Sequence, residues 1–99
     1  MGGISIRYSY SGDEAAWGSA IDTFVDAVDA DPDIGGKFSY AVSVAGDGVT
    51  RAHVGRWDSD STLKTLQSRD YFKSFSKAIQ EFAGGSLDAK QVTLYRETR

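Results

Sequence analysis

The sequence predicts an α+β fold in which the elements follow the order βαββαβ. Four segments carry the residues typical of strands, and most of them alternate apolar with polar side chains. Two longer segments between them repeat apolar residues at helical intervals. This order divides into two βαβ-like halves of the ferredoxin-like type, with a four-stranded antiparallel sheet covered by helices on one face. The 99 residues, 40% of them hydrophobic, suit a single domain spanning residues 1–99.

The first strand and the first helix are predicted in the N-terminal third. Residues 4–10 alternate Ile and Tyr with Ser and Arg, which indicates a strand with one apolar face. Ser11 and Glu14 have the spacing of a capping box, and apolar residues then recur at helical intervals. A helix is therefore expected from about residue 12 to 30. Pro32 and the glycines after it end this helix.

Two strands joined by a tight turn are predicted next. Residues 38–44 alternate aromatic or aliphatic with small side chains, and 46–48 read Gly-Asp-Gly, which suits a hairpin turn. The partner strand is expected from Val49 to Trp57. The register of this hairpin stays open. A two-residue loop places His53 on the aromatic face of the preceding strand, and a three-residue loop places it on the small polar face.

A broken helix follows the hairpin. The four residues after Trp57 are rich in helix-capping side chains. Leu66 and Phe72 are six residues apart, which does not fit one continuous helical face. The spacing predicts a short helix near 61–67, a break at Ser68-Arg69, and a second helix over about 70–82.

The C-terminal part is predicted to complete the sheet. Gly84-Gly85 suits a helix C-cap, and residues 87–96 contain the β-favouring run from Val92 to Tyr95. A fourth strand is therefore expected over these residues. A domain of this size has a modest core, which dimerisation would supplement.

Composition argues against several classes of function. The absence of cysteine excludes disulfides, iron–sulfur clusters and thiolate zinc sites. A net charge of −3, without a basic patch, argues against nucleic-acid binding. No apolar run is long enough for a signal sequence or a membrane span, so a cytoplasmic protein without membrane association is expected. A single histidine with scattered acidic residues has no metal-ligand spacing, and no metal is predicted.

The stretch from Trp57 to Phe75 carries a more specific signal. It reads Trp-Asp-Ser-Asp over residues 57–60 and Asp-Tyr-Phe over 70–72, with Leu63 between them. In this pattern the chain resembles the antibiotic biosynthesis monooxygenase-like family, of the dimeric α+β barrel superfamily, over residues 4–98. The resemblance implies a homodimer and a reaction in which O₂ attacks an electron-rich substrate anion without a cofactor.

The sequence departs from this family at positions that carry its chemistry. Many quinol-oxidising members have Glu at the position of Gly55, and His at those of Leu66 and Tyr71. The haem-degrading members have Trp at the position of Leu66 and an axial His at that of Ser76. Because both haem contacts are missing, haem binding is not expected.

Three groups of residues are candidates for a site. His53 is expected to transfer a proton near neutral pH, with a partly exposed strand histidine as the alternative. Trp57 and Tyr71 flank the capped turn, where they would hold an aromatic ligand, or they belong to the core. Tyr8 and Tyr40 would line the same cavity, or they too are core residues.

The residues and the resemblance together predict a cofactor-independent monooxygenase acting on a small aromatic or quinol-like molecule. His53 and Tyr71 are its candidate catalytic residues, and Trp57, Tyr40 and Tyr8 its candidate substrate-binding residues. If His53 is the base, activity should follow a group titrating between pH 5 and 8. The alternatives are a non-catalytic small-molecule-binding or assembly domain, and an isomerase or cyclase on the same scaffold.

Overall fold

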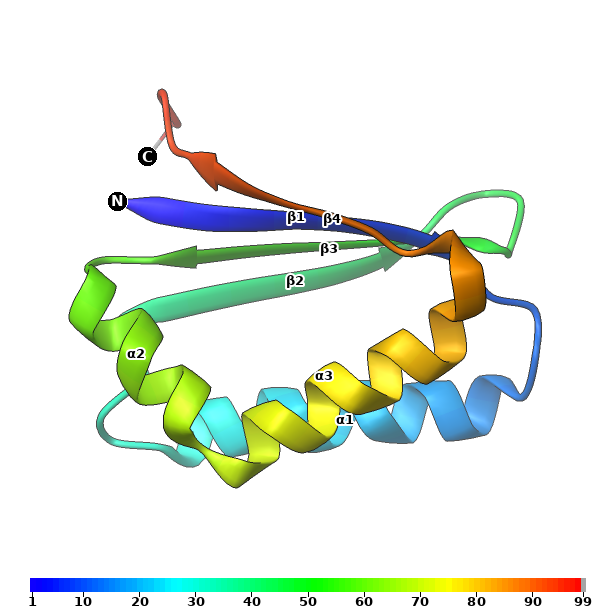
Figure 1. Cartoon of the computed structure of the whole chain (residues 1–99), viewed down its shortest axis with the longest axis horizontal. Helices are drawn as coiled ribbons and strands as arrows, with labels where there is room; N and C mark the ends of the chain where they lie inside the picture. The colour runs from blue at the N-terminus through cyan, green and yellow to red at the C-terminus, as the bar shows by residue number, and fades with distance from the viewer. Residues whose placement is uncertain (99) are drawn as a thin grey trace.

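The computed structural model describes residues 1–98 and confirms the predicted α+β fold, with a four-stranded antiparallel sheet. Its elements are β1 (Gly2–Ser9), α1 (Glu14–Ala30), β2 (Phe38–Val44), β3 (Thr50–Trp57), α2 (Asp60–Ser68), α3 (Asp70–Ala83), the 3-10 helix η1 (Gly84–Ser86) and β4 (Asp88–Thr93). The strand order is β2-β3-β1-β4. All the α-helices lie on one face of the sheet, and the other face carries no helix (Figure 1).

The hairpin between β2 and β3 has a four-residue turn. Ala45 N–H donates to the carbonyl of Thr50 at 2.9 Å, which leaves residues 46–49 in the turn. His53 therefore pairs with Val42, and its side chain lies on the aromatic face of β2. Side chains alternate between the two faces of a sheet, so a four-residue loop places His53 on the same face as a two-residue loop would. The position expected for a two-residue loop is therefore correct.

The N-terminal cap of α1 differs from the predicted one. Asp13, and not Ser11, caps the helix, because its Oδ1 accepts from the backbone N–H of Ala15 at 2.9 Å. Glu14 does not complete a capping box, since its carboxylate forms an ion pair with Arg51 on β3. The predicted helix thus exists, but its first residue, Glu14, binds strand β3 and takes no part in the cap.

The predicted break in the second helical region is confirmed at Arg69. This residue has φ −77° and ψ 138°, so it ends α2 and begins α3. The break turns α3 so that Phe75 stacks on Phe24 of α1, with ring centroids 4.0 Å apart. These two rings lie at the centre of the core between helices and sheet.

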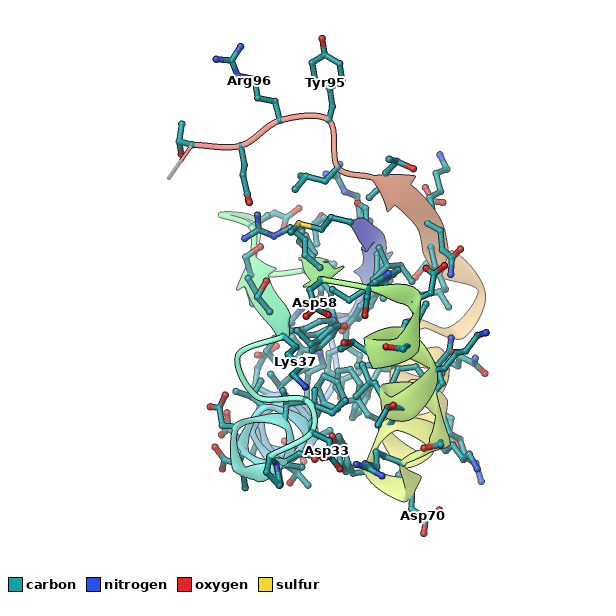
Figure 2. All side chains as sticks on the ribbon, turned by 90° about the vertical axis from the view of Figure 1, so that its left-hand side faces the viewer. Asp33, Lys37, Asp58, Asp70, Tyr95 and Arg96 are labelled. Atoms are coloured by element: carbon teal, nitrogen blue, oxygen red, sulfur yellow. The ribbon has the colours of Figure 1, made fainter. Side chains whose placement is uncertain are left out.

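The last strand is shorter than predicted. Strand β4 ends at Thr93, which pairs with Gly2 at the start of β1. Only Met1 precedes Gly2 in the sequence, so almost no backbone is left to pair with the segment after Thr93, and this segment leaves the sheet. Tyr95 and Arg96 stand away from the body of the molecule in Figure 2, and Tyr95 is 98% exposed. In residues 1–98, no helix has both the length and the apolar character that crossing a membrane requires.

Candidate functional site

A cavity of about 180 Å³ lies between the inner face of the sheet and helices α2 and α3. Its wall is mostly aromatic and aliphatic and includes Ile4, Ile6, Phe24, Trp57, Leu66 and Phe75. Its exposed lining residues come from α2, α3 and β4, and among them are Gln67, Gln80 and Gln91. The cavity therefore opens to solvent between the edge strand β4 and the two helices.

Tyr40 brings a polar group to the wall of this cavity. Its hydroxyl lies 2.6 Å from Nδ1 of His53, which is fully buried and outside the cavity wall. The other ring nitrogen of His53, Nε2, lies 2.8 Å from the hydroxyl of Tyr8. Trp17 Nε1–H donates to that same hydroxyl at 2.8 Å. A continuous chain of hydrogen bonds thus runs from α1 through β1 and β3 to Tyr40.

The sheet register and one glycine place Tyr40 against His53. Tyr40 pairs with Gly55 across the hairpin, so it is a diagonal neighbour of His53 on the same face. A Cβ at position 55 would lie 3.0 Å from Cδ1 of Tyr40 and 3.2 Å from Cγ2 of Ile4. Because position 55 has no side chain, the Tyr40 ring can lie across the strand and reach the imidazole.

Burial determines the protonation of the three titratable groups in this hydrogen-bond chain, His53, Tyr40 and Tyr8. It lowers the pKa of His53 to about 4, so the imidazole is neutral at pH 7. Burial also raises the pKa of Tyr40 and that of Tyr8 above the ordinary phenol value, so both hydroxyls keep their protons. The expected titration of His53 between pH 5 and 8 is therefore replaced by one near pH 4, because burial disfavours the charged imidazolium.

Tyr71 lies outside the cavity wall, although the sequence placed it in the site. Its hydroxyl donates to Asp31 Oδ2 at 2.8 Å, and Arg69 Nε donates to the same oxygen at 2.9 Å. Burial, with the Asp31 carboxylate next in importance, raises the pKa of Tyr71 to about 12. The hydrogen bond from Arg69, followed by that from Tyr71, lowers the pKa of Asp31 to about 2. The hydrogen bonds from Arg69 and Tyr71 to Asp31 thus connect the end of α1 to the start of α3.

Of the remaining candidate residues, two line the cavity and one lies behind its wall. Trp57 and Tyr40 line the cavity, as the sequence predicted for substrate-binding residues. Tyr8 is buried behind His53 and does not line it. The structure therefore brings Tyr8, Tyr40 and His53 together, and separates Trp57 from the hydroxyl of Tyr71.

Two residues near the site were missed by sequence reasoning. Trp17 is one of the apolar residues that α1 buries, and its indole also donates to Tyr8. Arg51 is fully buried, and its guanidinium carbon lies 4.4 Å from the centroid of the Trp17 ring. The position of Arg51 on the inward face of β3, two residues before His53, is the one sequence signal that could have indicated its burial.

Metal and haem chemistry receive no support from these side chains. Within residues 1–98, no group of three or more His, Asp or Glu side chains could hold a metal ion. Both ring nitrogens of His53, the single histidine, are occupied by tyrosine hydroxyls. An axial haem ligand would require one of these hydrogen bonds to break.

The fold and the cavity define a class of protein: a ferredoxin-like α+β domain with a small apolar cavity near a buried imidazole. No protein-family model matches the sequence, and no curated protein matches it. Solved structures of other proteins do share the fold.

Three of these structures illustrate the likeness. Rv0793 from Mycobacterium tuberculosis has a TM-score of 0.78 and 14% identity, with 99% of this chain and 98% of that chain covered. SnoaB, a cofactor-independent oxygenase from Streptomyces nogalater, has a TM-score of 0.74 and 11% identity, with 97% and 94% covered. An antibiotic biosynthesis monooxygenase has a TM-score of 0.65 and 9% identity, with 97% and 100% covered. The resemblance to this group is thus confirmed in the fold.

Proposed function

We propose that this protein is a cofactor-independent monooxygenase for a small aromatic or quinol-like molecule, which binds in the cavity beside Tyr40. The observation that carries the proposal is an apolar cavity with the hydroxyl-bearing Tyr40 in its wall and a neutral imidazole behind that hydroxyl. The fold shared with the oxygenase SnoaB adds support. An apolar pocket with a few fixed polar groups is the usual form of a small-molecule site.

The size of the cavity limits the substrate to about one aromatic ring. Its volume of about 180 Å³ is close to the roughly 150 Å³ of an engineered apolar cavity that binds benzene. Phe24 and Phe75 lie in the wall, where they can pack against the edge or face of a ligand ring. A phenol or hydroquinone with short substituents meets these limits.

The proposed reaction needs O₂ and the substrate alone. A phenol with a free ring C–H position loses its hydroxyl proton, and the resulting anion gives electrons to O₂. One oxygen atom enters the ring as a new carbonyl, and the other leaves as water. The product is a quinone, and the four electrons that reduce O₂ come from the substrate. The protein's contribution is to bind the ring, exclude water and stabilise the anion.

We assign the contact with the substrate oxygen to Tyr40, which lines the cavity and carries a hydroxyl group. His53 lies behind Tyr40 and is neutral at pH 7, so we assign it a positioning role in place of the proton transfer first expected. The substrate proton leaves to water through the mouth near Gln67, Gln80 and Gln91. The rate should therefore follow the pKa of the substrate hydroxyl and shift when ring substituents change that pKa.

An oxygen electrode and ¹⁸O₂ labelling test this function. A panel of alkyl-substituted phenols and hydroquinones should include one that consumes O₂ and yields a quinone carrying one ¹⁸O atom. Tyr40→Phe should lower turnover by roughly 10²-fold or more, as loss of an oxyanion donor does in other enzymes. Tyr71→Phe is the matched control, since it removes a phenol oxygen outside the cavity, and should leave turnover unchanged.

A non-catalytic binding domain is the second candidate. It is favoured because the cavity wall has no carboxylate or imidazole among the described residues. Binding of panel members without O₂ uptake would support this candidate and contradict the monooxygenase.

We further propose that the chain forms a homodimer through the helix-free face of the sheet. This face carries Val54 and Val92, which are 50% and 45% exposed. A sheet covered by helices on one side leaves the other face to water or to a partner.

A further inference from the structure

The hydrogen-bond chain behind the cavity has a direction that its donors determine. The indole N–H of Trp17 can only donate, so the oxygen of Tyr8 accepts from it. Tyr8 is 2% exposed, so bulk water does not reach its own proton. Among residues 1–98, the one acceptor within reach of that proton is Nε2 of His53, at 2.8 Å.

This direction selects one tautomer of the imidazole. If Tyr8 donates to Nε2, that nitrogen carries no proton, and the proton of the neutral ring is on Nδ1. The Nδ1–H group then donates to the oxygen of Tyr40 at 2.6 Å. The opposite tautomer would leave the Tyr8 proton buried without an acceptor, a condition that native structures rarely contain.

The tautomer in turn determines what Tyr40 offers to the cavity. With Nδ1 protonated, the hydroxyl proton of Tyr40 has no acceptor within the described residues. Tyr40 is half-buried and is one of the residues that line the cavity. A molecule bound there is therefore the candidate acceptor for this proton. In the opposite tautomer Tyr40 would donate to Nδ1, and only lone pairs of its oxygen would remain for a ligand.

We propose that Trp17 and Tyr8 hold His53 as the Nδ1–H tautomer, so that Tyr40 donates its proton into the cavity and selects ligands with an acceptor oxygen. The inference rests on the ligand-binding part of the proposed function. The ligand class it assigns is a single ring bearing a carbonyl or phenolate oxygen. A quinone or a phenolate belongs to this class, and an apolar ring of equal shape does not.

The tautomer can be measured directly on the unmodified protein. Because the chain contains a single histidine, ¹⁵N-histidine labelling gives the signals of His53 alone. Long-range ¹H–¹⁵N NMR at pH 7 should show a protonated Nδ1 and an unprotonated Nε2. A protonated Nε2 overturns the proposal. Tyr8→Phe removes the donor to Nε2 and should shift the equilibrium towards the Nε2–H form, and an unchanged tautomer in this variant also overturns it.

A matched pair of probes tests the selectivity. Acetophenone and α-methylstyrene have nearly the same shape, and only acetophenone presents an acceptor oxygen. The wild-type protein should bind acetophenone about tenfold more tightly, the equivalent of one hydrogen bond. Tyr40→Phe should remove this preference while keeping the affinity for α-methylstyrene. Equal affinities in the wild type, or binding of neither probe, overturn the inference.

The outcomes separate this inference from the proposed reaction. A clear preference for acetophenone without O₂ uptake by any phenol would sustain the inference and reject the monooxygenase. O₂ uptake without a preference between the probes would reject the inference and leave the monooxygenase standing.

Discussion

Burial of His53 should make the stability of the protein depend on pH in a range where few other groups titrate. Burial lowers the pKa of His53 from 6.5 to about 4 in the folded state. As the pH falls below 6.5, the unfolded chain therefore binds a proton that the folded chain refuses. Protonation then favours the unfolded state, so stability is lost progressively between pH 6.5 and about 4.

The magnitude follows from the two pKa values. At pH 5 the unfolded histidine is almost fully protonated and the folded one is mostly neutral, which lowers the free energy of unfolding by about 2 kcal/mol relative to pH 8. The full effect, below pH 4, is about 3 kcal/mol. The pKa values of Asp31 and Asp47 are lowered from 3.8 to about 2, so these groups act mainly below pH 4. The interval from pH 8 to pH 5 therefore isolates His53.

Urea unfolding of the wild type and His53→Gln at pH 8 and pH 5 provides the assay. Gln keeps hydrogen-bonding capacity between the two tyrosines but does not titrate, so the free energy of unfolding of this variant should change little between pH 8 and pH 5. Tyr71→Phe is the control that should retain the wild-type difference. An equal loss of stability in the wild type and His53→Gln, or an NMR titration of the folded protein with a His53 pKa near 6.5, would refute the reasoning.

Two further variants test the assignments of Tyr71 and of the open sheet face. Tyr71→Phe should lower the free energy of unfolding by about 1 kcal/mol, since it removes a hydrogen bond to Asp31, and should leave acetophenone affinity unchanged in calorimetry; weaker binding would return Tyr71 to the site. Light scattering should give twice the 10.7 kDa chain mass for the wild type and the single mass for Val54→Asp; a wild-type monomer at micromolar concentration contradicts the dimer.

The elements of the fold were predictable because their signals are local. Period-two alternation predicted the first two strands, the Gly-Asp-Gly turn predicted the third, and the irregular spacing of Leu66 and Phe72 located the helix break at Arg69. The N-cap differs from the predicted one because Ser11 and Asp13 are both good capping residues, and in the structure Asp13 accepts from backbone N–H groups in the first turn of the helix while Glu14 pairs with Arg51.

The candidate site was less predictable because it depends on register and on contacts across the sheet. The position of His53 on a strand was clear, but its face depended on a turn in which Asp47 Oδ1 accepts from Val49 N–H at 2.8 Å, which adds Val49 to the loop. The partners of the imidazole lie 45 residues away at Tyr8 and 13 away at Tyr40. No spacing within the sequence reports such pairs.

Gly55 connects the departure from the family pattern to the chemistry of the site. The resemblance implies a glutamate at this position in many quinol-oxidising relatives, and its absence first favours a protein without catalysis. In this structure a Cβ at position 55 would already lie 3.0 Å from the ring of Tyr40, so a glutamate there would require the Tyr40 ring to shift. Where the resemblance implies an anionic acceptor, this chain has the neutral phenol of Tyr40, which contacts His53. Under the proposed function Tyr40 offers a proton to a ligand oxygen, where a glutamate would take one from a quinol, so we expect the anion or the carbonyl product to bind best.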